Sequence, residues 1–261
     1  MGRCAAVVVG LIVLAGAGAM AQDAARVAFD VTSVKVNRSG SSDSYVNVPP
    51  GGTYSATNTT LARLLPNAFE LLPAQIVGSP GWFGTDRFDI LARPPAAAKP
   101  EDLPAMLRAL LADRFALKTH RERQERPIFA LTLVEAGKLG PRLTRAATDC
   151  EAVFAQKRVT PECQALMGIG RGGGQMTIKG QSLARLTSAL GFVLERPVVD
   201  QTGLTGQFDL ELKWSAGDAS ATSNDPEIFS AVREQLGLQL KPATGPVEVL
   251  VVDSAQHPTE D

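Results

Sequence analysis

The chain is poor in the residues that most enzymes use for catalysis and metal binding. Its 261 residues include two histidines, three cysteines and two tryptophans, and aromatic residues make up only 5%. His120 lies among the charged residues at 121–126 and His257 lies in a polar C-terminal tail, so neither is placed for a Ser-His-Asp triad. No His-x-x-x-His or Asp-x-Asp spacing occurs. We therefore predict no catalytic residue, no metal ligand and no cofactor.

An excess of charge of either sign is also lacking. The 26 lysines and arginines nearly balance the 27 aspartates and glutamates, which gives a formal net charge of −1. No basic stripe with interleaved aromatic residues is present, so the sequence does not predict a nucleic-acid surface.

The only long apolar run lies at the N-terminus, where it follows the basic residue Arg3. The run from Cys4 to Ala17 is shorter than the ~20 residues that a membrane-spanning helix needs, and Ala19-Met20-Ala21 is a small-x-small cleavage pattern. We predict a signal peptide at residues 1–21, cleavage after Ala21, and no membrane span after cleavage. The mature chain is then periplasmic or extracellular.

Cleavage leaves two cysteines, Cys150 and Cys163, with twelve residues between them. In an exported chain such a pair most simply forms a disulfide. A metal site and a reactive thiol pair are the two alternatives. No histidine lies near the pair, and the spacing matches no zinc pattern. The disulfide is therefore the preferred interpretation.

Two parts of the chain resemble each other when the sequence is shifted by 122 residues. Leu61–Leu64 then coincides with the identical Leu183–Leu186, and each stretch begins an amphipathic helix. Further matches follow in the same order: Ile76–Val77 with Val198–Val199, Gly81 and Gly84 with Gly203 and Gly206, and, after a two-residue gap, Phe88–Ile90 with Phe208–Leu210.

This order predicts an α+β fold made of two tandem copies of a β-α-β-β-α-β-β unit, with mixed sheets and with the helices on one face. Each copy should end in two strands, at 116–121 and 127–134 in the first and at 238–241 and 246–252 in the second. Gly81 and Gly203 should occupy the same turn with positive φ. The predicted divisions are a signal peptide at 1–21, a first repeat at 22–138, a linker at 139–174, a second repeat at 175–256 and a tail at 257–261.

The predicted linker contains both remaining cysteines and a glycine run at Gly168–Gly174. A phosphate-binding loop is the functional interpretation of this run. The run lacks the lysine of a P-loop and does not join a strand to a helix, so a flexible linker is the better prediction.

Two pairs of residues are candidates for a functional site. Trp82 and Phe83 follow Pro80-Gly81 on a turn and form either a binding surface for a peptide or sugar or a plug at the end of the core. Asp89 and Asp209 are equivalent in the two copies and could form the carboxylate pair of a glycoside hydrolase. Because each aspartate follows an inward-facing phenylalanine on a strand, it should point away from the core, which favours a structural role.

Motifs along nearly the whole mature chain are similar to those of an uncharacterised bacterial protein family. They are Phe29–Val31, Pro50–Gly52, Thr60–Leu61, Gly81–Trp82, Asp86–Ile90, Leu111–Phe115, Gly203–Asp209 and Gly245–Asp253. The resemblance implies an exported protein of a family that is expanded in soil bacteria. Some similar domains are fused to membrane metallopeptidases of the antibiotic-sensor type, on the outer side.

The resemblance implies a periplasmic sensing or interaction module, with no assigned activity. We therefore expect a non-enzymatic binding module, with Trp82 and Phe83 as binding residues and with exposed sheet edges that recruit a partner by strand addition. A cell-envelope protein or peptide is the kind of partner that fits an exported chain. The alternative function is a cell-wall or polysaccharide hydrolase that uses paired carboxylates.

Overall fold

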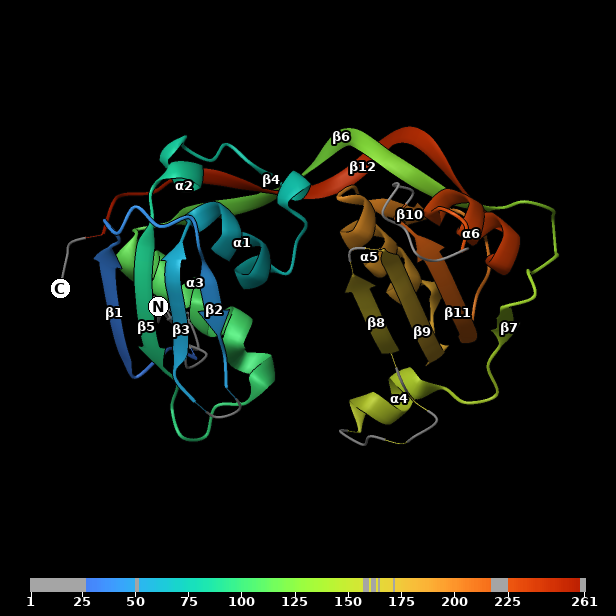
Figure 1. Cartoon of the computed structure of the whole chain (residues 1–261), viewed down its shortest axis with the longest axis horizontal. Helices are drawn as coiled ribbons and strands as arrows, with labels where there is room; N and C mark the ends of the chain where they lie inside the picture. Colours follow the sequence, from blue (N-terminus) through green and yellow to red (C-terminus); the bar gives the residue numbers. More distant parts are fainter. Residues whose placement is uncertain are drawn as a thin grey trace, which may run out of the picture.

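The chain folds into two lobes that are joined by a long two-stranded ribbon (Figure 1). Within the described residues there are three four-stranded sheets, one in each lobe and one that runs across both. The predicted signal peptide lies outside the described residues. The computed structural model describes residues 27–49, 52–156, 160, 163, 165–170, 172–216 and 225–258.

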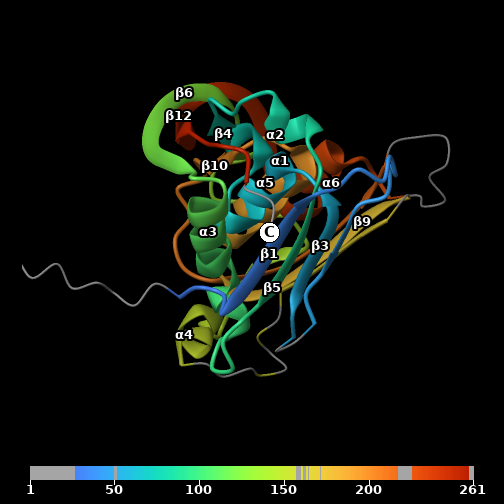
Figure 2. The same ribbon diagram turned by 90° about the vertical axis from the view of Figure 1, so that its left-hand side faces the viewer.

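The first lobe is built on an antiparallel sheet with the strand order β1-β5-β3-β2. Along β5, Phe88 and Ile90 face the core while Leu91 is exposed, which is the alternation of a sheet that is covered on one face. Helices α1 and α3 share a core with that buried face, and Figure 2 shows α3 on one side of β1, β5 and β3. The elements are β1 (Val31–Val36), β2 (Tyr45–Asn47), β3 (Tyr54–Thr59), α1 (Leu61–Phe69), α2 (Trp82–Thr85), β5 (Phe88–Arg93) and α3 (Leu103–Arg114), with short 3-10 helices at Pro73–Gln75 and Pro100–Asp102.

The second lobe has an antiparallel sheet with the strand order β7-β11-β9-β8. Phe208, Leu210 and Leu212 on β11 are buried, and they share a core with Leu186 and Leu190 on α5. The elements are β7 (Leu143–Arg145), α4 (Cys150–Ala155), β8 (Ala165–Gly170), β9 (Gly173–Gln181), α5 (Leu183–Leu194), β11 (Phe208–Ser215) and α6 (Ile228–Leu236).

The third sheet, with the order β10-β6-β12-β4, joins the lobes. Its centre is the ribbon of β6 (Lys118–Leu133) and β12 (Leu238–Ser254), which pair antiparallel along almost their whole length. The short strand β4 (Ile76–Val77) of the first lobe pairs parallel with β12, and β10 (Val198–Asp200) of the second lobe pairs parallel with β6.

Each half of the chain completes the core of the other lobe. Leu250 and Val252 on β12 pack into the core of the first lobe, whereas Phe129 and Leu131 on β6 pack into the core of the second. Neither half therefore has a complete core without the other, and cutting the chain between the lobes would expose apolar surface in both.

The fold is α+β, as predicted, and the helix starts at Leu61 and Leu183 are buried as expected. The prediction of two separate closing strands in each half is wrong. In the first half, the strands predicted at 116–121 and 127–134 form one continuous strand that runs through the charged residues between them. Charged side chains fit there because much of the ribbon is exposed, and the opposite charges of Arg121 and Glu248 pair across it.

Residues 139–174 do not form the flexible linker that was expected. The described part of this segment contains β7, α4 and β8, and both strands are edge strands of the second sheet. The glycines were interpreted as a sign of flexibility. Two of them, Gly173 and Gly174, instead allow close packing, since a Cβ atom on either would overlap Trp214.

The common glycine turn is also not found. Gly203 has a φ of +70°, but Gly81 lies in the right-handed region, with a φ of −56°, as the residue before α2. The first lobe forms a short helix at this point. The second lobe, where Leu204 and Thr205 replace Trp82 and Phe83, has no helix between β10 and β11.

Candidate functional site

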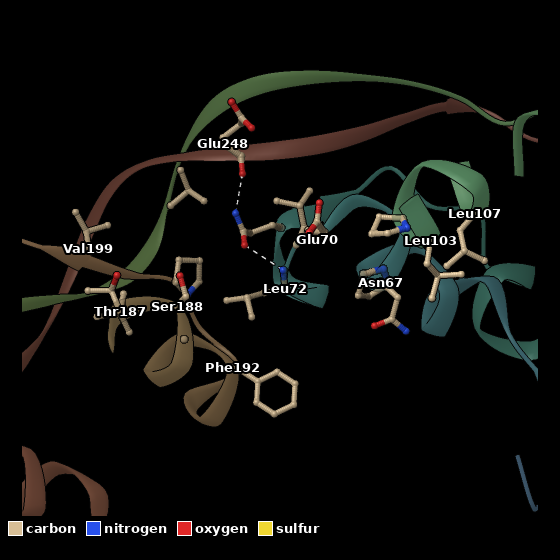
Figure 3. Close-up of a pocket in the computed structure, with 18 of the residues that line it drawn as sticks. Asn67, Glu70, Leu72, Leu103, Leu107, Thr187, Ser188, Phe192, Val199 and Glu248 are labelled. Carbon is tan, nitrogen blue, oxygen red and sulfur yellow. Dashed lines mark hydrogen bonds between the residues drawn. The ribbon is translucent and has the colours of Figure 1, made fainter. Parts of the chain in front are cut away.

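A cleft of about 880 Å³ lies between the two lobes. The first lobe contributes β2, α1 and α3 to its walls, and the second lobe contributes α5. Strands β10 and β12 close it on the side of the ribbon (Figure 3). Its volume falls within the range of ligand-binding pockets, which makes it the candidate site.

Apolar side chains make up most of the cleft wall. Phe192 is 60% exposed, and its ring extends from α5 toward the side formed by the first lobe (Figure 3). Val46 and Val48 lie on the opposite wall and are also exposed. Together these residues form an apolar surface that an apolar ligand would cover.

Most polar groups of the cleft wall already have intramolecular partners. The hydroxyls of Thr187 and Ser188 both donate to the Ala184 carbonyl, at 3.0 and 2.9 Å. The Gln75 side chain accepts from the Leu72 amide at 3.1 Å and donates to the Glu248 carbonyl at 3.0 Å (Figure 3). Such groups shape the cleft but have little left to offer to a ligand.

The two charged residues that line the cleft are both carboxylates, Glu70 and Glu248. Glu248 pairs with Arg121, which lies on the ribbon outside the cleft. Glu70 ends α1 in a left-handed conformation, with a φ of 56°, and within the described residues it forms no ion pair. The cleft wall is therefore apolar with an acidic group at its edge.

The remaining titratable group of the cleft wall, Tyr54, is held in its neutral form. The side chain is 3% exposed, and burial raises the pKa of its phenol to about 12. A phenol with this pKa is not a base at neutral pH. The acid–base groups of the described cleft wall are thus the carboxylates Glu70 and Glu248.

Two exposed sheet edges lie beside the cleft. Strand β2 is the outer strand of the first sheet, and all three of its residues are exposed. Strand β8 is the outer strand of the second sheet, and Leu166, Met167 and Ile169 on it are between 44% and 61% exposed. Phe192 joins the two regions, because it lines both the cleft and a smaller hollow of about 170 Å³ beside β8.

Sequence reasoning missed the cleft, although one signal for it exists. Phe192 does not fall on the apolar stripe of its helix, which comprises Leu183, Leu186 and Leu190. An aromatic residue outside the stripe indicates contact with something other than the core of its own lobe.

The predicted binding residues Trp82 and Phe83 lie outside the cleft. Phe83 is 1% exposed and belongs to the core, whereas Trp82 is only partly buried. The His257 ring stacks on Trp82, with 4.1 Å between the ring centroids, and its Nε2 lies 2.7 Å from Asp86 Oδ2. The C-terminal segment thus covers Trp82, an arrangement that the polar sequence of the tail did not suggest.

The other histidine, His120, lies on the exposed ribbon. Its Nδ1 is 2.8 Å from Asp253 Oδ1, and Glu122 is on its other side at 3.7 Å. The contact with Asp253 joins β6 to β12, whereas Glu122 lies on β6 itself, and all three side chains are exposed. His120 therefore belongs to the charged surface of the ribbon, as its sequence context indicated.

Asp89 and Asp209 lie in different lobes, and each holds a neighbouring strand in place. Asp89 Oδ1 accepts hydrogen bonds from the Asn58 amide and the Asn37 side chain, both at 2.8 Å. Asp209 Oδ1 accepts from the Gly180 amide at 2.8 Å. Hydrolysis requires two carboxyl groups on either side of one glycosidic bond, and two aspartates that hold separate sheets do not form such a pair.

The predicted disulfide between Cys150 and Cys163 is present and buried. It links the start of α4 to Cys163, just before β8, and the Cys150 sulfur lies next to Gly180 on β9. Glu151 on α4 accepts a hydrogen bond from the Ser182 amide, at the start of α5. Hydrogen bonds from the side chain and amide of Ser182 lower the pKa of Glu151. The disulfide thus fixes the segment that supports one wall of the cleft.

The described residues contain no cluster of three or more His, Cys, Asp or Glu side chains that could hold a metal ion. A helix with the length and apolarity needed to cross a membrane was not found in the same part of the chain.

Comparison with known proteins gives one finding. The model of a family described as "Protein of unknown function (DUF3738)" matches residues 62–255. No curated protein and no solved structure matches the chain.

Proposed function

The chain belongs to the DUF3738 family, whose description assigns no function, and from its geometry we propose that it is a non-enzymatic binding module. The ligand site is the cleft between the lobes. The observation that carries this proposal is an apolar cleft of about 880 Å³ with an exposed phenylalanine on its wall. An exposed apolar surface of this kind is a common feature of binding sites.

The chemistry of the described cleft wall supports binding over hydrolysis. Its phenol is kept neutral by burial, and most of its polar side chains bond to the backbone. The aspartates considered for hydrolysis, Asp89 and Asp209, do not line the cleft, and of the two carboxylates that do, Glu248 is paired with Arg121.

We propose that the module works outside the cytoplasm, in the periplasm or beyond. The signal-peptide pattern at residues 1–21 and the disulfide both fit an oxidising compartment. The soil-bacterial origin, and a sensing role like that of domains fused to membrane metallopeptidases, are further parts of this proposal. They rest on the sequence resemblance.

We also propose that the two halves are tandem copies of one unit. The strand orders β1-β5-β3-β2 and β7-β11-β9-β8 support this, because each strand has its counterpart at the same place. The third sheet adds further support, since β4 pairs with β12 in the same parallel way as β10 pairs with β6. The cleft would then have formed where two copies meet, with Glu70 of one copy opposite its counterpart Phe192 in the other.

Binding of the neutral apolar dye Nile red to the mature chain, residues 22–261, tests the site. We expect dye fluorescence to rise on binding, and Ser188→Trp to abolish this rise, because Ser188 is exposed on α5 and lines the cleft. Ala184→Trp is the matched control, since it adds the same ring at an exposed position on the same helix outside the cleft. Equal dye binding by the two variants would refute the cleft as the ligand site.

A further inference from the structure

We propose that the ligand of the cleft is an extended, neutral-to-basic peptide segment with apolar side chains, which adds a strand to β2. This inference rests on the proposed function and gives its ligand a chemical class. Three observations support it: the free edge of β2, the spacing of its apolar residues, and the charge of the cleft wall.

The free edge of β2 favours a peptide over other apolar ligands. β2 pairs with β3 on one side, and its other side is the outer edge of the sheet. Such an edge presents unpaired N–H and C=O groups, which another peptide backbone can satisfy with hydrogen bonds in a regular pattern. A lipid chain or a small apolar molecule would fill the cleft but leave these groups to water.

The residues of β2 also show how such a segment would lie. Val46 on β2 and Val48, one residue beyond its end, both line the cleft, and they are two residues apart, so they lie on the same face of the extended chain. An added strand would place every second side chain on this face, opposite Phe192 on α5. Apolar side chains at alternate positions of the peptide are therefore required.

The charge of the cleft wall selects among such peptides. Both charged residues of the wall are carboxylates, and Glu70 forms no ion pair within the described part of the chain. A glutamate or aspartate on the peptide would be repelled, whereas a lysine or arginine near Glu70 would be attracted. The segment is thus neutral or basic.

The test uses a fluorescein-labelled peptide of nine residues in which valine alternates with threonine, with lysine at both ends. We expect the peptide to bind the mature chain and to displace Nile red. A version with N-methyl groups on alternate backbone amides keeps every side chain but loses donors, and it should bind about tenfold more weakly or worse. Equal affinity of the two versions would overturn strand addition.

The charge preference has its own matched pair of variants. Glu70→Lys should weaken binding of the lysine peptide several-fold and improve binding of a peptide with glutamate at both ends. Glu195→Lys is the control, because Glu195 ends α5 in the same left-handed conformation, is exposed, and lies outside the cleft. Equal effects of the two variants would overturn the role of Glu70 in selecting the peptide.

Two outcomes separate this inference from the function on which it rests. If Nile red binding is blocked by Ser188→Trp but the peptide fails to displace the dye, the cleft binds ligands and the peptide proposal is wrong. Displacement by palmitate instead would identify a lipid site. If neither dye nor peptide responds to Ser188→Trp, both proposals fall.

Discussion

The two lobes contain the same kink near the end of a strand that leads into a helix, β3 before α1 and β9 before α5. In the first lobe Asn58 on β3 adopts a left-handed conformation, with a φ of 53°, and in the second Gly180 on β9 does so, with a φ of 58°. The amide of each donates a 2.8 Å hydrogen bond to an aspartate on the neighbouring strand, Asp89 or Asp209. The pairing register shifts at both places, as it does at a β-bulge.

The lobes differ in how the kink holds the adjacent connection. The Asn58 side chain donates to the carbonyls of Ser41 and Asp43, at 2.7 and 2.6 Å, and so binds the loop between β1 and β2. Gly180 has no side chain, and the Cys150 sulfur occupies the space beside it. The same backbone conformation therefore occurs with two different contacts to the adjacent segment. In the first lobe the contact is a side-chain amide, and in the second it is a disulfide.

The largest expected effect comes from a side chain at position 180. Gly180→Val would put a Cβ atom on top of the Cys150 sulfur and force a β-branched residue to adopt positive φ. Strain of about 1–2 kcal/mol from the backbone adds to the steric overlap, so we expect a loss of unfolding free energy of about 3 kcal/mol or more. Urea unfolding of the oxidised protein measures this loss of unfolding free energy.

Gly137→Val separates the two causes of the expected loss at Gly180, which are backbone strain and steric overlap. Gly137 has a φ of +74°, and no atom lies within 4 Å of the place where its Cβ would be. This variant should show the backbone strain alone, about 1–2 kcal/mol. Similar losses in the two variants would mean that the Cys150 sulfur leaves room at Gly180.

Removal of the disulfide is the next largest expected effect. Cys150→Ala combined with Cys163→Ala opens a loop whose ends are 13 residues apart, and the loop-entropy model gives a loss of about 3 kcal/mol. Reduction of the wild-type protein should produce the same shift in urea midpoint, and reductant should leave the double variant unchanged. A shift below about 1 kcal/mol would show that hydrogen bonds of α4 alone hold this segment.

Substitution of the two aspartates compares the kinks of the two lobes directly. Asp89→Ala leaves the Asn58 amide and the Asn37 side chain without their acceptor, whereas Asp209→Ala leaves the Gly180 amide alone. We expect losses of about 1–3 kcal/mol, with the larger loss at Asp89. Asp89→Asn and Asp209→Asn keep an acceptor oxygen and should lose less. A larger loss at Asp209 than at Asp89 would contradict this order.

Local patterns predicted the local structure well. Alternating burial placed Phe88 and Phe208 in the cores, and the helical stripes placed Leu64 and Leu186 there. The disulfide followed from the predicted export and from the spacing of the two cysteines that remain after cleavage. The buried positions depend on which face of a helix or strand is apolar, and the sequence records that directly.

Arrangement over longer distances could not be predicted in the same way. The continuous apolar runs at 128–131 and 249–252 indicate that Phe129 and Leu250 are buried, but they do not show that each packs in the opposite lobe. The cleft depends on how the two lobes meet, and its residues Glu70 and Phe192 belong to different lobes. The contact of His257 with Trp82 joins residues 175 positions apart, and no periodic pattern marks it.

The smallest expected effect is a pH-dependent one, and it again compares the lobes. Hydrogen bonds from the His257 and Thr85 side chains lower the pKa of Asp86 from its usual 3.8, and the hydrogen bonds of Ser182 lower that of Glu151 from its usual 4.5. A carboxylate with a lowered pKa stabilises the fold fully above its ordinary value, and this contribution is lost as the pH falls through the folded value. Glu151 should therefore begin to lose its contribution below about pH 4.5, and Asp86 below about pH 3.8.

Each lobe has its own tryptophan for this measurement, Trp82 beside the tail and Trp214 in the second core. In a Trp214→Phe background, the emission of Trp82 should change below about pH 3.8 as the His257 ring leaves it. Asp86→Asn, which cannot ionise, should remove this step and leave the rest of the acid titration unchanged. If the Trp82 step persists in Asp86→Asn, the ionised Asp86 does not hold the tail on the first lobe.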